Sequence, residues 1–157
     1  MSLKRKLEGE IEIREAAGHV FHDMYKHTPH HLSHASPDFV QSCDLHEGQL
    51  GKPGSVVLWK YKLGGKPHTM KCVFEEIDEE KKLVKQRGIE GGVMEDYKSI
   101  VGTCHVIPKD KEVSIVKWTL EYEKKHAGIP EPTALLDACL LAAKHVDDHH
   151  HGIKQSN

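Results

Sequence analysis

The sequence predicts an α+β fold in which one long helix packs against a curved antiparallel sheet. The first observation is the apolar rhythm of residues 131–151, where apolar side chains recur at the three- and four-residue spacing of one helix face. The second is a series of short segments before residue 124 in which apolar and polar residues alternate. Strands grouped apart from one long helix are typical of a layered α+β architecture.

Residues 3–13 alternate between apolar and charged side chains, which predicts a half-buried strand. Segment 15–34 changes to a helical spacing that is interrupted at Pro29, so two short helical pieces are expected there. Six further strands are expected at residues 38–45, 55–63, 67–77, 82–90, 93–107 and 112–123. Short loops join these segments, so neighbouring strands should pair antiparallel. The alternation directs one set of side chains toward the helix, including Leu3, Leu7, Ile11, Val116, Trp118 and Leu120.

The long helix is expected to begin near Pro132 or Thr133 and to end before Gly152. A helix of about 20 residues is about 30 Å long. Asp147 is among the polar residues assigned to its outer face. The apolar face carries several small side chains, including Ala142 and Ala143, which cannot fill the hollow of a strongly curved sheet at normal packing density. The sequence therefore predicts an apolar void, and a Phe at either alanine is expected to enter it.

Composition narrows the functional classes. The chain has 157 residues, so one domain over 1–157 is the default expectation. A net charge of −2 leaves no basic footprint for nucleic acid or for an anionic membrane surface. No apolar run is long enough to span a membrane and the N-terminus lacks a signal-peptide pattern, which predicts a cytoplasmic protein. The four cysteines form no CxxC pair and are expected to be reduced.

Several segments, taken together and in order, resemble plant major latex proteins, which belong to the Bet v 1 and pathogenesis-related class 10 superfamily. These segments are residues 29–33, 36–38, 43–48, 54–56, 59–61, 77–80, 90–94 and 116–124. The resemblance implies a helix-grip fold, with a seven-stranded sheet around a long C-terminal helix and two short helices closing one end. It also implies an intracellular carrier, defence- or latex-associated, that holds small hydrophobic metabolites or lipids in an internal cavity.

Ligand contacts are expected from inward apolar and aromatic residues, with tyrosine hydroxyls as polar handles. The expected residues are Leu7, Ile11, Phe39, Leu58, Tyr61, Phe74, Tyr97, Trp118, Leu136, Cys139, Leu140 and Ala143. No cofactor and no metal are expected. The histidine-rich segments lack a defined zinc pattern, and the glycines of loop 46–54 lack the Gly-Lys-Ser/Thr ending of a phosphate-binding loop. Those glycines are predicted to form turns with positive φ.

An enzyme in the same cavity is the main alternative. A cyclase or isomerase acting on a reactive terpenoid of the iridoid type, or on an alkaloid intermediate, needs a shaped dry cavity and one placed acid or base. His22 and Tyr97 are the candidates for that role. The sequence contains no nucleophile motif. A third alternative is a module that binds a protein partner through the loops at the cavity mouth.

Overall fold

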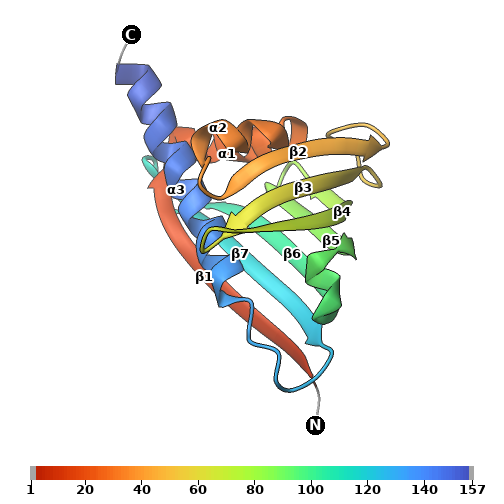
Figure 1. Cartoon of the computed structure of the whole chain (residues 1–157). Helices are drawn as coiled ribbons and strands as arrows, with labels where there is room; N and C mark the ends of the chain where they lie inside the picture. Colours follow the sequence, from red (N-terminus) through yellow and green to blue (C-terminus); the bar gives the residue numbers. More distant parts are fainter. Residues whose placement is uncertain (1–2, 156–157) are drawn as a thin grey trace.

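The computed structural model describes residues 3–155, and the side chains of these residues except Val20, Tyr25 and 151–155. Seven antiparallel strands curve around helix α3, and three short helical pieces cover one end of the sheet (Figure 1). The elements are β1 (Lys4–Arg14), α1 (Glu15–His27), η1 (Pro29–His31), α2 (Leu32–Ala35), β2 (Val40–Glu47), β3 (Val56–Leu63), β4 (Lys66–Asp78), β5 (Leu83–Gly91), η2 (Gly92–Glu95), β6 (Tyr97–Pro108), β7 (Val113–Lys124) and α3 (Thr133–Gln155). The predicted α+β helix-grip fold is confirmed.

The sheet order is β1-β7-β6-β5-β4-β3-β2, so the N-terminal strand lies beside the last one. In the β1–β7 register Leu7 pairs with Leu120 and Ile11 with Val116. Val116 and Leu120 are buried, whereas Lys4 and Lys6 are exposed. The predicted direction of these faces is confirmed, because side chains two residues apart point to the same side of a strand.

Gly9 lets α3 pack closely on β1. A Cβ atom at this position would lie 2.7 Å from Leu140 Cδ1 and 3.5 Å from Leu136 Cδ2. One row of helix side chains, Leu136, Leu140 and Ala143, therefore faces β1 and its neighbourhood. Residues at these spacings share one helix face.

The expected strand over 93–107 begins later than predicted, at Tyr97. Residues Gly92–Glu95 form the short helix η2 instead. Gly91 has φ of 114° and approaches the backbone of Thr69 so closely that a Cβ would lie 2.4 Å from its carbonyl oxygen. This turn, which needs glycine, ends β5 and redirects the chain before β6.

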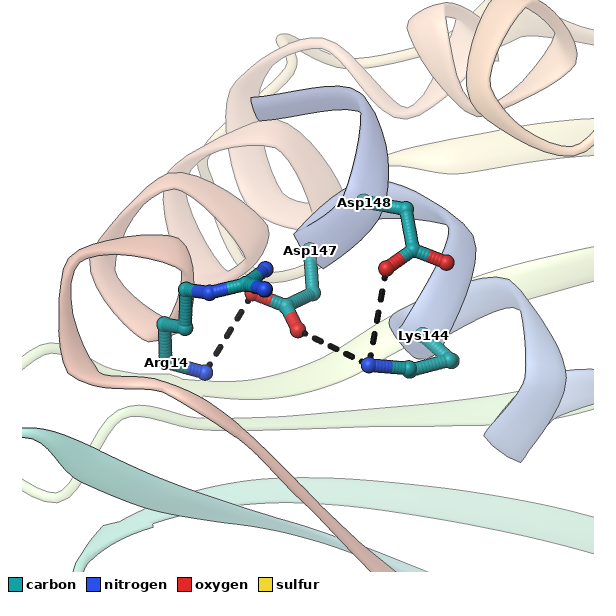
Figure 2. Close-up of polar contacts among 4 residues, drawn as sticks. All are labelled: Arg14, Lys144, Asp147 and Asp148. Carbon is teal, nitrogen blue, oxygen red and sulfur yellow. Dashed lines mark hydrogen bonds and ion pairs between the residues drawn. The ribbon is translucent and has the colours of Figure 1, made fainter. Parts of the chain in front are cut away.

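The prediction that Asp147 lies on the outer, polar face of α3 is wrong, because its side chain is only 2% exposed. Its Oδ1 accepts hydrogen bonds from the Arg14 backbone N–H at 3.3 Å and from Arg14 Nη1 at 3.1 Å. Its Oδ2 lies 3.3 Å from Lys144 Nζ, which also pairs with Asp148 (Figure 2). A buried carboxylate is stable only when paired in this way, so Asp147 joins α3 to the β1–α1 junction.

Two further contacts hold the short helices over the end of the sheet. Ser36 Oγ lies 2.8 Å from His145 Nδ1 of α3, and Lys26 of α1 pairs with Glu79 in the turn after β4. The predicted positive φ values are confirmed at the loop glycines Gly48, Gly51 and Gly54. None of the helices in the described part of the chain is long and apolar enough to cross a membrane.

Candidate functional site

A cavity of about 100 Å³ lies between the concave face of the sheet and α3. Side chains from every strand except β1, from the short helical region and from α3 surround it. Its lining residues are Phe21, Leu32, Phe39, Val40, Trp59, Tyr61, Met70, Cys72, Gln86, Gly88, Ile100, Gly102, Trp118, Leu120, Leu135, Cys139 and Ala142. A space of this kind, with mostly apolar walls, is suited to apolar solutes and is poorly wetted.

The polar groups among these walls are few. Gln86 Oε1 accepts a hydrogen bond from Trp59 Nε1 at 2.9 Å, so the two side chains satisfy each other inside the sheet. The glycines preserve space, because a Cβ at Gly102 would lie 3.4 Å from the Trp118 ring. Tyr61 adds a phenol hydroxyl and Trp118 an indole N–H.

Two thiols line the cavity from opposite layers, Cys72 from β4 and Cys139 from α3. Burial raises the pKa of each thiol to about 12. Both thiols are therefore protonated at neutral pH and serve as apolar wall rather than as nucleophiles. All four cysteines of the chain are free.

A second pocket, open and of about 810 Å³, adjoins the cavity; we call it the vestibule. Positively charged, negatively charged and uncharged polar side chains surround it. Tyr61 and Leu135 line both this pocket and the cavity. Its lining residues are Gln41, Lys60, Tyr61, Lys62, Leu63, Pro67, His68, Thr69, Gly92, Val93, Glu95, Asp96, Tyr97, Pro130, Glu131, Pro132, Ala134 and Leu135. The two pockets therefore meet at Tyr61 and Leu135.

A hydrogen-bonded cluster fixes the end of segment 125–132, where Pro130, Glu131 and Pro132 form part of the vestibule wall. Tyr97 Oη donates to the Pro130 carbonyl at 2.7 Å, and Tyr122 Oη donates to Glu131 Oε1 at 2.8 Å. Lys124 Nζ, which is almost completely buried, lies 2.7 Å from Glu131 Oε2. The hydrogen bonds from Lys124 and Tyr122 lower the pKa of Glu131. Burial, followed by the bond to Glu131, raises the pKa of Tyr122.

The predicted contact residues divide into three groups. Phe39, Tyr61, Trp118 and Cys139 line the cavity, and Tyr97 lines the vestibule together with Tyr61. The remaining predicted residues line neither pocket: Leu7, Ile11, Leu58, Phe74, Leu136, Leu140 and Ala143.

Strand direction and helix packing explain why four of these residues lie outside the pockets. Leu58 alternates with the cavity-lining Trp59, so it lies on the outer face of β3. Leu136 and Leu140 belong to the helix row that packs on Gly9. Ala143 is fully buried in the same row, so a Phe at 143 is expected to overpack the core instead of entering the void.

The predicted contact residues include only part of the neighbouring helix row, in which Leu135, Cys139 and Ala142 all line the cavity. Of this row, Cys139 was among the predicted contact residues, and Ala142 was expected to border the void. Leu135 and Ala142 belong to the same apolar helix pattern, but periodicity alone does not say which row meets a void. Phe21 and Leu32 also line the cavity. Their position there depends on how the short helices pack over the sheet, which local periodicity does not determine.

His22 and Tyr97 do not line a common pocket. His22 is 5% exposed and lines neither the cavity nor the vestibule. Its Nε2 has no hydrogen-bond partner among the described residues, and burial together with the Lys26 charge lowers its pKa. Within residues 3–155 as described, no group of three or more His, Cys, Asp and Glu side chains is placed to hold a metal ion.

Comparisons with known proteins agree with this fold. The model of the pathogenesis-related protein Bet v 1 family matches residues 2–151. MLP-like protein 43 of Arabidopsis thaliana is 44% identical over 149 residues, covering 94% of each chain. The crystal structure of ginseng major latex-like protein 151 from Panax ginseng matches with a TM-score of 0.89 and 39% identity, over 94% of this chain and 98% of that one.

A more distant structure is a norcoclaurine synthase point mutant from Thalictrum flavum in complex with a transition state analogue. It matches with a TM-score of 0.71 and 25% identity, over 96% of this chain and 98% of that one. The family model and the relative at 44% identity each cover most of the sequence. The chain therefore belongs to the pathogenesis-related protein Bet v 1 family, among its major-latex-protein-like members.

Proposed function

We propose that this protein is an intracellular carrier that binds small hydrophobic plant metabolites or lipids. The observation that supports this function is an apolar cavity between sheet and helix that adjoins a polar, open vestibule. Such a site buries the apolar part of a ligand and leaves its polar part near water, with a few polar groups to fix orientation. The complex of the norcoclaurine synthase variant with a transition state analogue adds that a protein of this fold binds a small organic molecule.

A fluorescent naphthalene sulfonate tests the proposal. We expect the probe to bind, and terpenoids or lipids to displace it competitively. Ala142→Phe should weaken binding without unfolding the protein, because the new ring enters the cavity that Ala142 lines. Leu141→Phe is the matched control, since Leu141 is 52% exposed on the same helix. Equal binding in both variants would place the probe outside the cavity, and binding of neither the probe nor any other apolar ligand above that of an unrelated compact protein would contradict the carrier function.

A cyclase or isomerase is the second candidate function. The similarity to a norcoclaurine synthase supports it, because that protein of the same fold is an enzyme by name. Tyr97 is the candidate residue that lies in the vestibule, and its hydroxyl is bonded to the Pro130 carbonyl. An enzyme would change the stereochemistry of the product and lose this effect in Tyr97→Phe. A carrier would leave the product ratio equal to that in water, so product analysis separates the two functions.

We further propose that the carrier is cytoplasmic and is associated with plant defence or with latex. Four free thiols support a reducing compartment. Imaging of a fluorescent fusion in plant cells tests the location, and native mass spectrometry of protein purified from its own tissue identifies the bound metabolite. A protein partner at the vestibule rim would appear in the same preparation as a stoichiometric second chain.

A further inference from the structure

The cavity and the vestibule share two lining residues, Tyr61 and Leu135, and we call this boundary the partition. Tyr61 comes from β3 and Leu135 from the first turns of α3, so the partition joins the sheet to the helix. The Tyr61 ring is stacked with His68 at 5.5 Å between centroids and meets Phe39 edge-on at 5.9 Å. These aromatic contacts hold the Tyr61 ring at the boundary.

The volume of the cavity limits what fits behind this partition. An engineered apolar cavity of about 150 Å³ in another protein stays dry and binds benzene. The cavity here measures about 100 Å³, so it has room for one ring or a similarly slim group. A sterol nucleus or a long acyl chain is too large unless the partition opens. The vestibule, at about 810 Å³, has room for the rest of a larger ligand.

The Tyr61 hydroxyl supplies a polar contact at the same place. Tyr61 is 5% exposed, but its hydroxyl is not among the buried polar atoms without a partner in the described part of the chain, so the oxygen reaches accessible space at the boundary of the two pockets. A ligand oxygen at this place can accept a hydrogen bond from the phenol, and the low exposure of the side chain keeps competing water scarce. Burial raises the pKa of Tyr61, so the phenol stays neutral and can donate to a ligand hydroxyl or carbonyl.

We propose that Tyr61 and Leu135 determine ligand specificity at this site. The preferred ligand carries a single-ring apolar group that fills the cavity, with a hydroxyl or carbonyl on that group bonded to Tyr61. Any further polar part lies in the vestibule. This inference rests on the carrier function and specifies the class of ligand.

The hydroxyl contact is tested by calorimetric titration with p-cresol and toluene, which differ by one hydroxyl group. We expect the affinity ratio of p-cresol to toluene to fall about 2- to 10-fold in Tyr61→Phe, the effect of one net hydrogen bond. The affinity for toluene should stay the same, because the ring of residue 61 is retained. An unchanged ratio would overturn the role of Tyr61.

The size limit is tested by Leu135→Ala, with 2-naphthol and p-cresol as ligands. Removing the leucine should raise the affinity ratio of 2-naphthol to p-cresol about 50-fold, the gain expected from burying three further carbon atoms. Leu45→Ala is the matched control, since Leu45 is exposed on β2 and should leave the ratio as it is in the original protein.

The outcomes separate this inference from the carrier function. If the protein binds the naphthalene sulfonate and a sterol as tightly as p-cresol, and neither substitution alters the ratios, the carrier function stands and the partition model fails. If no apolar ligand binds at all, both fail. Circular dichroism of each variant verifies the fold, and the two substitutions lie on different elements, so one unstable variant leaves the other informative.

Discussion

At the residue scale, Asp147 shows how a polar residue becomes part of the core. The helix pattern assigns it to the outer face, but its carboxylate is buried against Arg14. Two hydrogen bonds from one residue, one of them from the backbone, compensate for the lost hydration. Asp148, one residue later, is 58% exposed and, among the described side chains, pairs only with Lys144.

This difference predicts unequal effects of two similar substitutions. Asp147→Ala should lower the free energy of unfolding by about 1–3 kcal/mol, because it removes charged hydrogen bonds and leaves the Arg14 N–H without an acceptor. Asp148→Ala should change it by less than about 0.5 kcal/mol, as is usual for surface positions. Urea unfolding of the two variants measures both values. Equal losses would show that Asp147 does not join the helix to β1.

At the element scale, segment 125–132 depends on side chains from β6 and β7. Tyr97 and Tyr122 contact each other edge-on at 5.7 Å, and both bond to this segment. Lys124 adds a nearly buried ammonium beside Glu131. The vestibule wall therefore responds to the charge of Glu131.

Because the pKa of Glu131 is lowered in the folded protein, the contribution of this residue to the free energy of unfolding should depend on pH. The ionised carboxylate stabilises the fold above its ordinary pKa of 4.5, and this contribution is lost as the pH falls through the lower folded-state value. The original protein should thus be more stable than Glu131→Gln at neutral pH, and the difference should shrink below pH 4.5. Urea unfolding at several pH values measures it, and Glu95→Gln serves as a vestibule control. A difference that does not vary with pH would refute the assignment.

At the scale of the whole molecule, α3 packs more tightly against one edge of the sheet than against its middle strands. At β1 the helix packs tightly, since Gly9 admits Leu136 and Leu140. Toward the middle strands the adjacent helix row meets a void, lined by Leu135, Cys139 and Ala142. Because the cavity exists only when sheet and helix are assembled, ligand binding is coupled to folding.

This coupling makes a prediction for the complete chain. We expect one cooperative unfolding transition, as for a single domain of this size. A ligand at 100 times its dissociation constant should raise the free energy of unfolding by about 2.7 kcal/mol. Ala142→Phe should reduce this increase at the same ligand concentration. Two separate transitions would contradict the single-domain expectation, and a ligand effect equal in both proteins would place binding outside the cavity.

The element order, the antiparallel pairing and the inward faces of β1 and β7 could be predicted from the sequence alone. The physical reason is that the two-residue period of strands and the 3.6-residue period of helices are local properties of the chain. Positive φ at the glycines of loop 46–54 is local in the same sense. The late start of β6 was missed because it depends on how closely Gly91 approaches Thr69, a contact between two strands.

Only the tertiary structure decided which buried residues meet a void and which meet a neighbour. Leu136 and Cys139 belong to one apolar pattern, yet the first packs on β1 and the second lines the cavity. Tyr61 lies at the partition because β3 and the start of α3 come together there. Periodicity sets the direction of a side chain, whereas the distance to what lies opposite depends on how the curved sheet closes around the helix.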